Sequence, residues 1–311
     1  MIDKLSKGRL LNGGRPFFRK FFFEDLTAKM RQKAKKIIIL HPNINRKILN
    51  TMKKRLLLIS MVLAFAGATA QNNTVPGKTD IEQQEYLKTE EVPNSLYILP
   101  VHPEFNSVQF LNDQFQYYWG KNLRNTERGQ QAISDVTLDG LQGMNNAFGE
   151  VFGTPITLEN APEIFTLVRS IGRDAGGIAP KAAKNHYKRT RPFVFFNDNT
   201  STPDEEEHMR NSGSYPSGHS CYGFAAALIL AEINPEHQNE IIKRGFEIGE
   251  SRKIVGAHYD SDVQAGRIMA AATVAALHSN DAFQKQLAKA KEEFTKLKKA
   301  GKIKPSTFNM N

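Results

Sequence analysis

The chain has 311 residues and a formal net charge of +10 at neutral pH, with 42 Lys and Arg against 32 Asp and Glu. The excess is confined to residues 1–70, which carry 16 basic and 3 acidic side chains and leave the remainder slightly acidic. This distribution argues against a nucleic-acid-binding domain, which needs its basic charge within the folded part of the chain. A single cysteine, Cys221, excludes an internal disulfide bond.

Residues 52–70 have the three parts of a secretory signal peptide. Three basic residues follow Met52, a short apolar run comes next, and Ala68-Thr69-Ala70 forms a small-residue cleavage site before Gln71. We therefore expect an exported, periplasmic protein, with an uncleaved membrane anchor as the alternative. Residues 1–51 are basic and irregular, so we expect an upstream extension, with Met52 as the true start.

The residues after the signal peptide predict one all-α domain, a single helical bundle. Residues 71–102 are polar and rich in proline breaks, which predicts an extended lead-in to a domain over 103–311. Helical spacing begins after Pro103, where Val108, Leu111, Phe115 and Tyr118 recur every three or four residues. No part of 71–311 reaches the roughly 18 apolar residues of a membrane span, so no span is expected after signal cleavage.

Further helices are predicted over 126–136, 138–148, 158–171, 177–188, 220–233, 235–252, 260–277 and 281–299. The run 220–233 is apolar on nearly all sides, which predicts a buried central helix with Cys221 as a small core residue. The segment 193–213 is the longest break and is rich in acidic residues. It is either a solvated surface loop or a lid over the site that follows it.

Polar residues suited to catalysis stand in three ordered motifs: Lys184-x6-Arg191-Pro192, Pro216-Ser217-Gly218-His219 and Ser251-Arg252-x5-His258-x3-Asp262. Ser217 precedes the apolar run and is predicted to cap that helix. The amides of Gly218 and His219 would then lie at the positive end of the helix, where an anion is favoured. With the three cations of the motifs, the site is suited to a tetrahedral dianion such as phosphate.

The two histidines of these motifs favour chemistry as well as binding. His258 and Asp262 are four residues apart, so on a helix they share one face and the carboxylate can accept the Nδ1 proton. Nε2 is then available as a nucleophile toward phosphorus, and His219 can act as a general acid. Each residue alone is also typical of a helix cap or a salt bridge; their joint pattern favours catalysis.

Together the motifs resemble those of the type 2 phosphatidic acid phosphatase (PAP2) superfamily, which includes lipid phosphatases, vanadium haloperoxidases and bacterial class A non-specific acid phosphatases. The string from Gly213 to His219 is similar to the class A enzymes in particular, although Ser220 stands where threonine is expected. The resemblance implies a role for each matching residue: His258 as nucleophile, Asp262 as its orienting partner, His219 as acid, and Lys184, Arg191, Ser217, Gly218 and Arg252 as phosphate-binding residues.

The sequence therefore predicts an exported acid phosphatase that hydrolyses phosphate monoesters of small molecules through a phosphohistidine intermediate. No carboxylates cluster at metal-ligand spacing, so we expect neither a metal nor another cofactor. The alternatives are a phosphatase of lipid-linked or lipid A phosphates, a vanadium-dependent haloperoxidase, and a catalytically silent phosphate-binding protein. Nucleic acid is not an expected partner, and the formation of homo-oligomers stays open.

Overall fold

The computed structural model describes residues 85–138 and 140–306, which lie within one compact unit of the chain, Asp80–Asn311. All regular elements of these residues are helical, which confirms the all-α prediction. The predicted signal peptide at 52–70 and the extension at 1–51 lie outside the described residues. None of the described helices is both long enough and apolar enough to cross a membrane.

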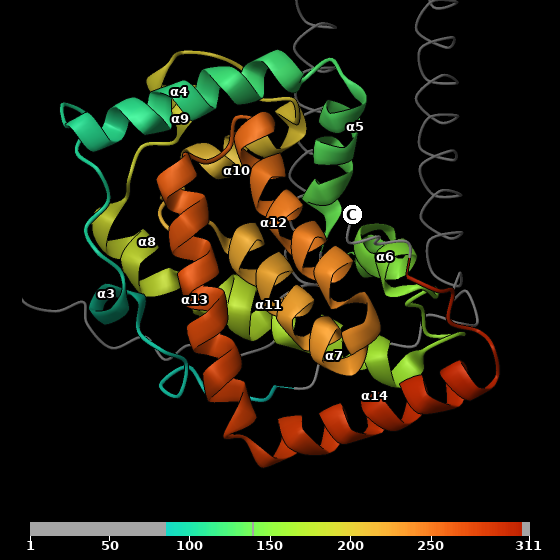
Figure 1. The fold of residues 1–311 in the computed structure, drawn as a ribbon. Helices are drawn as coiled ribbons and strands as arrows, with labels where there is room; N and C mark the ends of the chain where they lie inside the picture. Colours follow the sequence, from blue (N-terminus) through green and yellow to red (C-terminus); the bar gives the residue numbers. More distant parts are fainter. Residues whose placement is uncertain (1–84, 139, 307–311) are drawn as a thin grey trace, which may run out of the picture. The chain divides into compact units, whose positions relative to one another are not determined.

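Helix α11 (Gly218–Ile233) is the buried centre of the fold, as predicted. It contacts α7 (Pro162–Gly172), α12 (Gln238–Ile254) and α13 (Asp260–His278), and α11, α12 and α13 lie together in the middle of Figure 1. The close packing of α11 on α12 depends on Gly245, because a Cβ added there would lie 2.4 Å from the Ala227 Cβ. The middle of α11 is therefore packed closely against α12.

Further elements lie around this centre. They are α3 (Ser95–Ile98), α4 (Val108–Leu123), α5 (Glu127–Ser134), α6 (Glu150–Phe152), α8 (Lys181–Tyr187), α9 (Pro192–Phe195) and α10 (Glu206–Arg210), with π-helical Asn145–Gly149 and Arg173–Ile178 and 3₁₀ turns at Asp135–Thr137, Pro203–Glu205 and Pro235–His237. Helix α14 (Asp281–Lys299), along the bottom of Figure 1, packs on α7.

The helix predicted over 138–148 is wrong in position. Helical structure begins only at Gly143 and continues through π-helical Asn145–Gly149 into the three-residue α6. The polar lead-in also differs from its prediction, because it contains α3 and contributes Tyr86, Leu87 and Leu99 to the core. The apolar residues of this segment are too widely spaced to form a helical pattern, so the sequence did not indicate that they are buried in the core.

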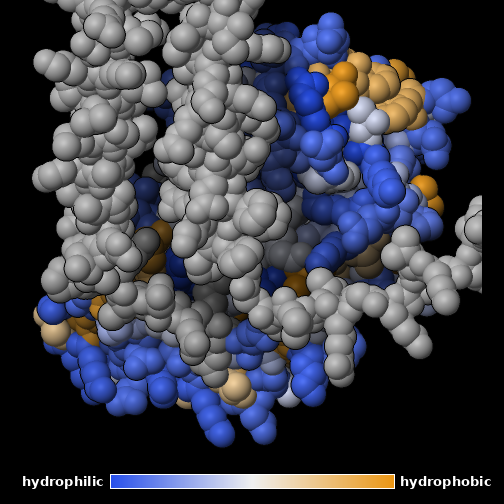
Figure 2. Space-filling view, turned by 180° about the vertical axis from the view of Figure 1, so that it is seen from behind, coloured by the Kyte–Doolittle hydropathy of each residue, from blue (hydrophilic) through white to orange (hydrophobic). Residues whose placement is uncertain are grey.

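The apolar residues whose spacing predicted α4 do not lie on its buried face. Val108, Leu111, Phe115 and Tyr118 are 53 to 78 % exposed, whereas the opposite face buries Phe110, Asp113, Tyr117 and Gly120. Figure 2 shows apolar side chains at the upper right, where the half turn from Figure 1 brings α4. Both faces follow helical spacing, so only the tertiary contacts of α4 with α12 and α13 decide between them.

The acidic segment 193–213 is more ordered than the predicted break, because it contains part of α9, a 3₁₀ turn and α10. Asp198 is a structural residue there: its carboxylate accepts a hydrogen bond from the Tyr117 hydroxyl at 2.7 Å and pairs with Lys121 at 2.6 Å. Asp204, Glu205 and Glu207 remain exposed. A lid role for this segment stays a prediction.

Candidate active site

The eight predicted site residues come from several elements that the fold brings together. Lys184 lies on α8, Arg191 directly before α9, Ser217 to His219 at the start of α11, Arg252 in the last turn of α12, His258 in the turn that follows, and Asp262 in the first turn of α13. His258 lies within electrostatic reach of Lys184, Arg191, Arg252 and His219, because the charges of all four act on its pKa. The motifs therefore form one cluster.

The start of α11 is held against α13. Ser217 is fully buried and its Oγ caps α11 by accepting the Ser220 N–H at 3.3 Å, as predicted. Its own N–H donates to the Asp262 carbonyl at 2.9 Å, which fixes one helix start against the other. Gly218 lies against the Gly176 carbonyl, where a Cβ would come within 2.8 Å. The positive end of α11 is thus directed into the cluster.

Three cations of the cluster are enclosed without a carboxylate partner among residues 85–138 and 140–306. Arg191 is held by carbonyl oxygens, with its Nε 3.0 Å from the Met209 oxygen, and Lys184 Nζ donates to the Gly213 carbonyl at 2.8 Å. Arg252 is only 2 % exposed, and its Nε and Nη1 have no hydrogen-bond partner in the described part of the chain. Enclosed cations of this kind are stabilised by an anion.

Burial and mutual repulsion lower the proton affinity of these cations. Burial and the neighbouring Arg191 lower the pKa of Arg252 to about 10, and burial lowers the pKa of Arg191 to about 10 as well. Lys184 keeps some exposed surface, yet burial of its amine and the charge of Arg191 lower its pKa to about 7. A bound dianion would reverse these shifts by stabilising the charged forms.

His258 lies 3.4 Å from the Asp262 carboxylate, measured from Nδ1 to Oδ2. Its Nε2 lies 3.0 Å from Arg191 Nη1, which only donates, so Nε2 carries the lone pair and Nδ1 the hydrogen. Burial and the charge of Arg191 hold the pKa of His258 well below its usual range. The ring is therefore neutral, with its nucleophilic nitrogen directed toward the cations.

The predicted helical placement of His258 is wrong, and its Nδ1 approaches Asp262 without forming the predicted hydrogen bond. Helix α13 begins at Asp260, so His258 lies in the turn before it. Asp262 reaches back instead and accepts the Tyr259 N–H at 2.9 Å, which closes the start of the helix and brings the carboxylate to the imidazole. The pair meets through a helix cap rather than through a shared helix face.

His219 is oriented by a backbone carbonyl. Its Nε2 lies 3.0 Å from the Val136 oxygen, and a carbonyl can only accept, so the hydrogen is on Nε2 and Nδ1 is free to exchange a proton. Burial and the charge of Arg252 lower the pKa of His219 to about 3. The ring is thus neutral until an anion compensates the nearby cations.

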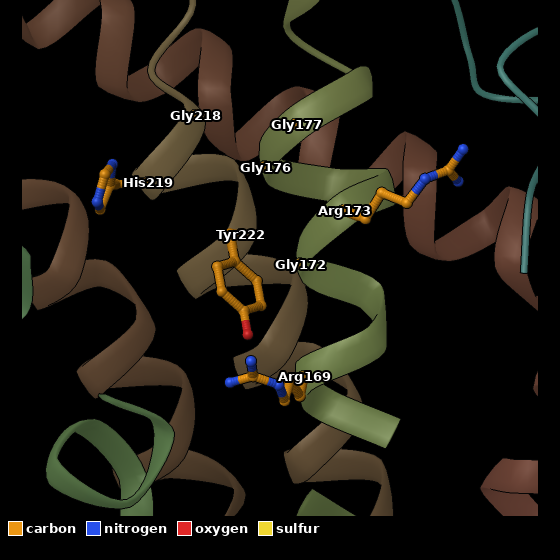
Figure 3. Close-up of a pocket in the computed structure, with 8 residues that line it drawn as sticks. All are labelled: Arg169, Gly172, Arg173, Gly176, Gly177, Gly218, His219 and Tyr222. Atoms are coloured by element: carbon orange, nitrogen blue, oxygen red, sulfur yellow. The ribbon is translucent and has the colours of Figure 1, made fainter. Parts of the chain in front are cut away.

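A cavity of about 300 Å³ adjoins the cluster at the start of α11. Among the predicted site residues, only Gly218 and His219 line it. Figure 3 shows its other wall along α7 and the following π-helical segment, with Arg169 directed toward the Tyr222 hydroxyl. Gly172 has no room for a side chain, since a Cβ there would lie 2.7 Å from the Tyr222 ring. Because Gly218 and His219 belong to both, the cavity can hold a group attached to an anion in the cluster.

Anion binding should weaken as pH rises through the pKa of Lys184. The amine is charged below a pKa of about 7 and neutral above it. Sulfate stays a dianion from pH 6 to pH 8, so only the charge of Lys184 changes over this range. At one pH unit above its pKa, about one tenth of the amine is still charged, and the affinity for sulfate should therefore fall by about tenfold. Calorimetric titration of sulfate measures the change. A Lys184→Met variant should lose the pH dependence, and pH-independent binding by the unmodified protein would contradict the assignment.

The sequence interpretation missed several groups that hold the cluster together. Arg189, two residues before Arg191, bonds to Asp262, and Asp113 on α4 bonds to Arg189 in turn. The carbonyls of Val136 and Gly213 fix His219 and Lys184. Arg189 could have been noted as a second arginine within the first motif. Asp113 and the carbonyls leave no signal in the sequence, because their contacts are made only in the fold.

Known proteins are similar to most of this chain. Residues 168–285, which contain all three motifs, match the model of the PAP2 superfamily. A non-specific acid phosphatase of Providencia stuartii is 49% identical over 251 residues, which cover 79% of this chain and 100% of the relative. A non-specific acid phosphatase of Salmonella typhimurium is 37% identical over 242 residues, 78% of this chain and 93% of the relative. An acid phosphatase of Zymomonas mobilis is 34% identical over 202 residues, 65% of this chain and 75% of the relative. The chain therefore belongs to the non-specific acid phosphatases of the PAP2 superfamily, which confirms the family that its motifs indicated.

Proposed function

We propose that this protein hydrolyses phosphate monoesters by forming a phosphohistidine on His258. The observation that carries the proposal is the meeting of three enclosed, carboxylate-free cations with a neutral imidazole whose Nε2 lone pair points toward them. Binding alone would need the cations and the amides of α11, but not an imidazole with a carboxylate behind it. Membership of the acid phosphatase family supports the hydrolase part of the proposal.

In the first step, the phosphoryl oxygens take over the hydrogen bond that Arg191 now donates to His258 Nε2. The freed lone pair attacks phosphorus in line with the ester oxygen, so a P–N bond forms as the P–O bond breaks. Lys184, Arg191 and Arg252 stabilise the negative charge on the equatorial oxygens. Because the bound dianion offsets these cations, the pKa of His219 rises, and its Nδ1–H can protonate the leaving oxygen.

In the second step, water cleaves the phosphohistidine. The deprotonated Nδ1 of His219 accepts a proton from the water as its oxygen attacks phosphorus, and the P–N bond breaks to return a neutral His258. While phosphorylated, the imidazole keeps its Nδ1 hydrogen and bears a positive charge, which the Asp262 carboxylate 3.4 Å away stabilises. The two steps use the same cations, so one site serves both.

A panel of substrates tests this function. The protein should release inorganic phosphate from an aryl phosphate and a nucleotide, and its activity should survive a metal chelator. Preferential cleavage of a phosphorylated lipid would favour the lipid phosphatase alternative. Halide oxidation in the presence of vanadate and peroxide, without ester hydrolysis, would favour the haloperoxidase and contradict the proposal.

We further propose that the protein acts after export to the periplasm, on the basis of the signal-peptide pattern at 52–70. Expression from Met52 in a Gram-negative host should yield protein in the periplasmic fraction that begins at Gln71. Amino-terminal sequencing checks this. Recovery in the membrane fraction with Lys53 still attached would contradict cleavage and favour an anchor.

A further inference from the structure

A buried arginine outside the predicted site bridges α4 and the start of α13. The Arg189 side chain has no exposed surface; its Nη1 donates to Asp262 Oδ1 at 2.6 Å, and its Nη2 donates to Asp113 Oδ2 at 2.8 Å. The two carboxylates are 0 and 1 % exposed. One guanidinium thus joins the carboxylate behind His258 to a carboxylate on a distant helix.

The two oxygens of Asp262 have separate roles in this arrangement. Oδ1 accepts from Arg189, while Oδ2 accepts the Tyr259 N–H and faces His258 Nδ1. A carboxylate held at one oxygen and capped at the other cannot rotate freely. The arginine therefore determines which oxygen faces the imidazole and at what angle.

Arg189 is itself held from several sides. Its Nη1 also donates to Ser261 Oγ at 2.8 Å, and the Ser261 hydroxyl donates to Asp113 at 2.6 Å. The guanidinium lies over the Tyr259 ring, with its central carbon 4.2 Å from the ring centroid. Burial alone would lower the pKa of Arg189, but Asp262 and Asp113 more than offset it and hold that pKa above the ordinary value. The bridge therefore stays charged.

From these contacts we infer that Arg189, supported by Asp113, is a positioning residue that sets the Asp262 carboxylate for its action on His258. The inference rests on the proposed function, in which His258 is the nucleophile. The Arg189 side chain donates to Ser261, Asp262 and Asp113, none of which is a predicted phosphate-binding residue. Its removal should therefore lower the rate of the chemical step and leave anion binding unchanged.

Asp113 also affects the charge balance around His258. Besides Asp262, the charged and titratable groups that face His258 are Lys184, Arg191, Arg252 and His219. An arginine bonded to Asp262 alone would compensate much of the negative charge that His258 needs from it. Because the positive charge of Arg189 is shared between Asp113 and Asp262, it offsets less of the negative charge of Asp262. Asp262 can therefore stabilise a positively charged His258 more strongly.

The test is a double-mutant cycle on kcat. Arg189→Gln should lower kcat by about 10- to 100-fold, by analogy with the loss of a partner that orients a metal-ligating side chain. Its KM and its affinity for vanadate should stay within a few-fold of the unmodified protein. In an Asp262→Asn background the same substitution should cause almost no further loss. If Arg189 had only a structural role, the losses of kcat from the two substitutions would multiply in the double variant. The melting temperature and the affinity for vanadate would fall as well.

A matched control is available on α13, the helix that carries Asp262. Arg267 is 8 % exposed and bonds to Glu250 at 2.9 Å, but it contacts none of the predicted site residues. Arg267→Gln should therefore change kcat by no more than a few-fold even if it lowers the melting temperature. Arg189→Lys, which keeps the charge but can make only part of the bridge, should recover part of the lost rate.

If Arg189→Gln does not fold, the cycle is run with Asp113→Asn in place of the arginine substitution. The expected result is a smaller loss of kcat, again absent in the Asp262→Asn background. Unchanged kcat in the single variants, or losses that multiply in the double variant, would overturn the inference. An inactive unmodified protein, or an Asp262→Asn variant of full activity, would count against the proposed function instead.

Discussion

A His258→Ala variant is expected to hydrolyse phosphate esters at no measurable rate and still to bind vanadate. Alanine removes the Nε2 lone pair that forms the P–N bond, so neither step of the proposed mechanism can begin. Lys184, Arg191 and Arg252 and the amides of α11 remain, and these groups supply the affinity for a tetrahedral anion. Initial rates and equilibrium binding of vanadate measure the two properties on the same preparation.

His278 provides a control for this prediction. It lies at the end of α13 and pairs with Glu232 at 2.9 Å, away from the predicted site residues. His278→Ala should therefore keep its activity. If His258→Ala still turns over while vanadate binding is normal, water attacks phosphorus directly and His258 is not the nucleophile.

Asp262→Asn should lower kcat by about 10³- to 10⁴-fold and change KM little. An asparagine is nearly the same size, but it has no negative charge to stabilise the positively charged phosphohistidine, and it can orient the imidazole incorrectly; the same substitution in a serine protease triad costs about 10⁴-fold. Burst kinetics with an aryl phosphate separate formation of the phosphohistidine from its hydrolysis.

Asp260 is the matched control, since it lies in the same first turn of α13 and pairs with Lys253 at 2.8 Å. Asp260→Asn should keep kcat within a few-fold. Equal losses in the two variants would mean that the start of α13 needs its aspartates for folding, and the orienting role of Asp262 would lose its support.

The parts of the fold that could be predicted are those defined by local chemistry. Helix α14 spans the predicted residues 281–299, because Asn280 caps it by accepting the Phe283 N–H and its apolar residues recur with helical spacing. The start of α11 was also predicted, since Ser217 followed by an apolar run is a capping pattern. In both cases the deciding contacts lie within a few residues of sequence.

Two features were not predicted, one because it depends on a distant contact and the other because a helix cap sets where α13 begins. Helix α4 turns its more apolar face outward because Asp113, on the other face, pairs with Arg189 and so belongs inside. His258 lies before α13 rather than on it, because Asp262 caps the Tyr259 N–H. Contacts such as that of Asp113 with Arg189 span 76 residues of sequence, and no pattern in a single sequence predicts them.

The motifs predicted which residues form the site but not how they are arranged. Their order along the chain indicated which side chains meet, and the structure does bring Lys184, Arg191, Arg252, His219 and His258 together. Spacing could not show that Arg191 bonds to Nε2 of His258, or that a carbonyl leaves Nδ1 of His219 free. These details decide which nitrogen attacks and which one carries the proton.

The central claim is that a covalent phosphate forms on His258, and rapid-quench labelling tests it most directly. The protein is mixed with a ³²P-labelled phosphate ester, denatured in alkali within its first turnovers, and digested for peptide mapping. The account predicts base-stable, acid-labile label on the peptide that contains His258, and no label in His258→Ala. Turnover of the ester with no label on that peptide at any quench time would contradict it.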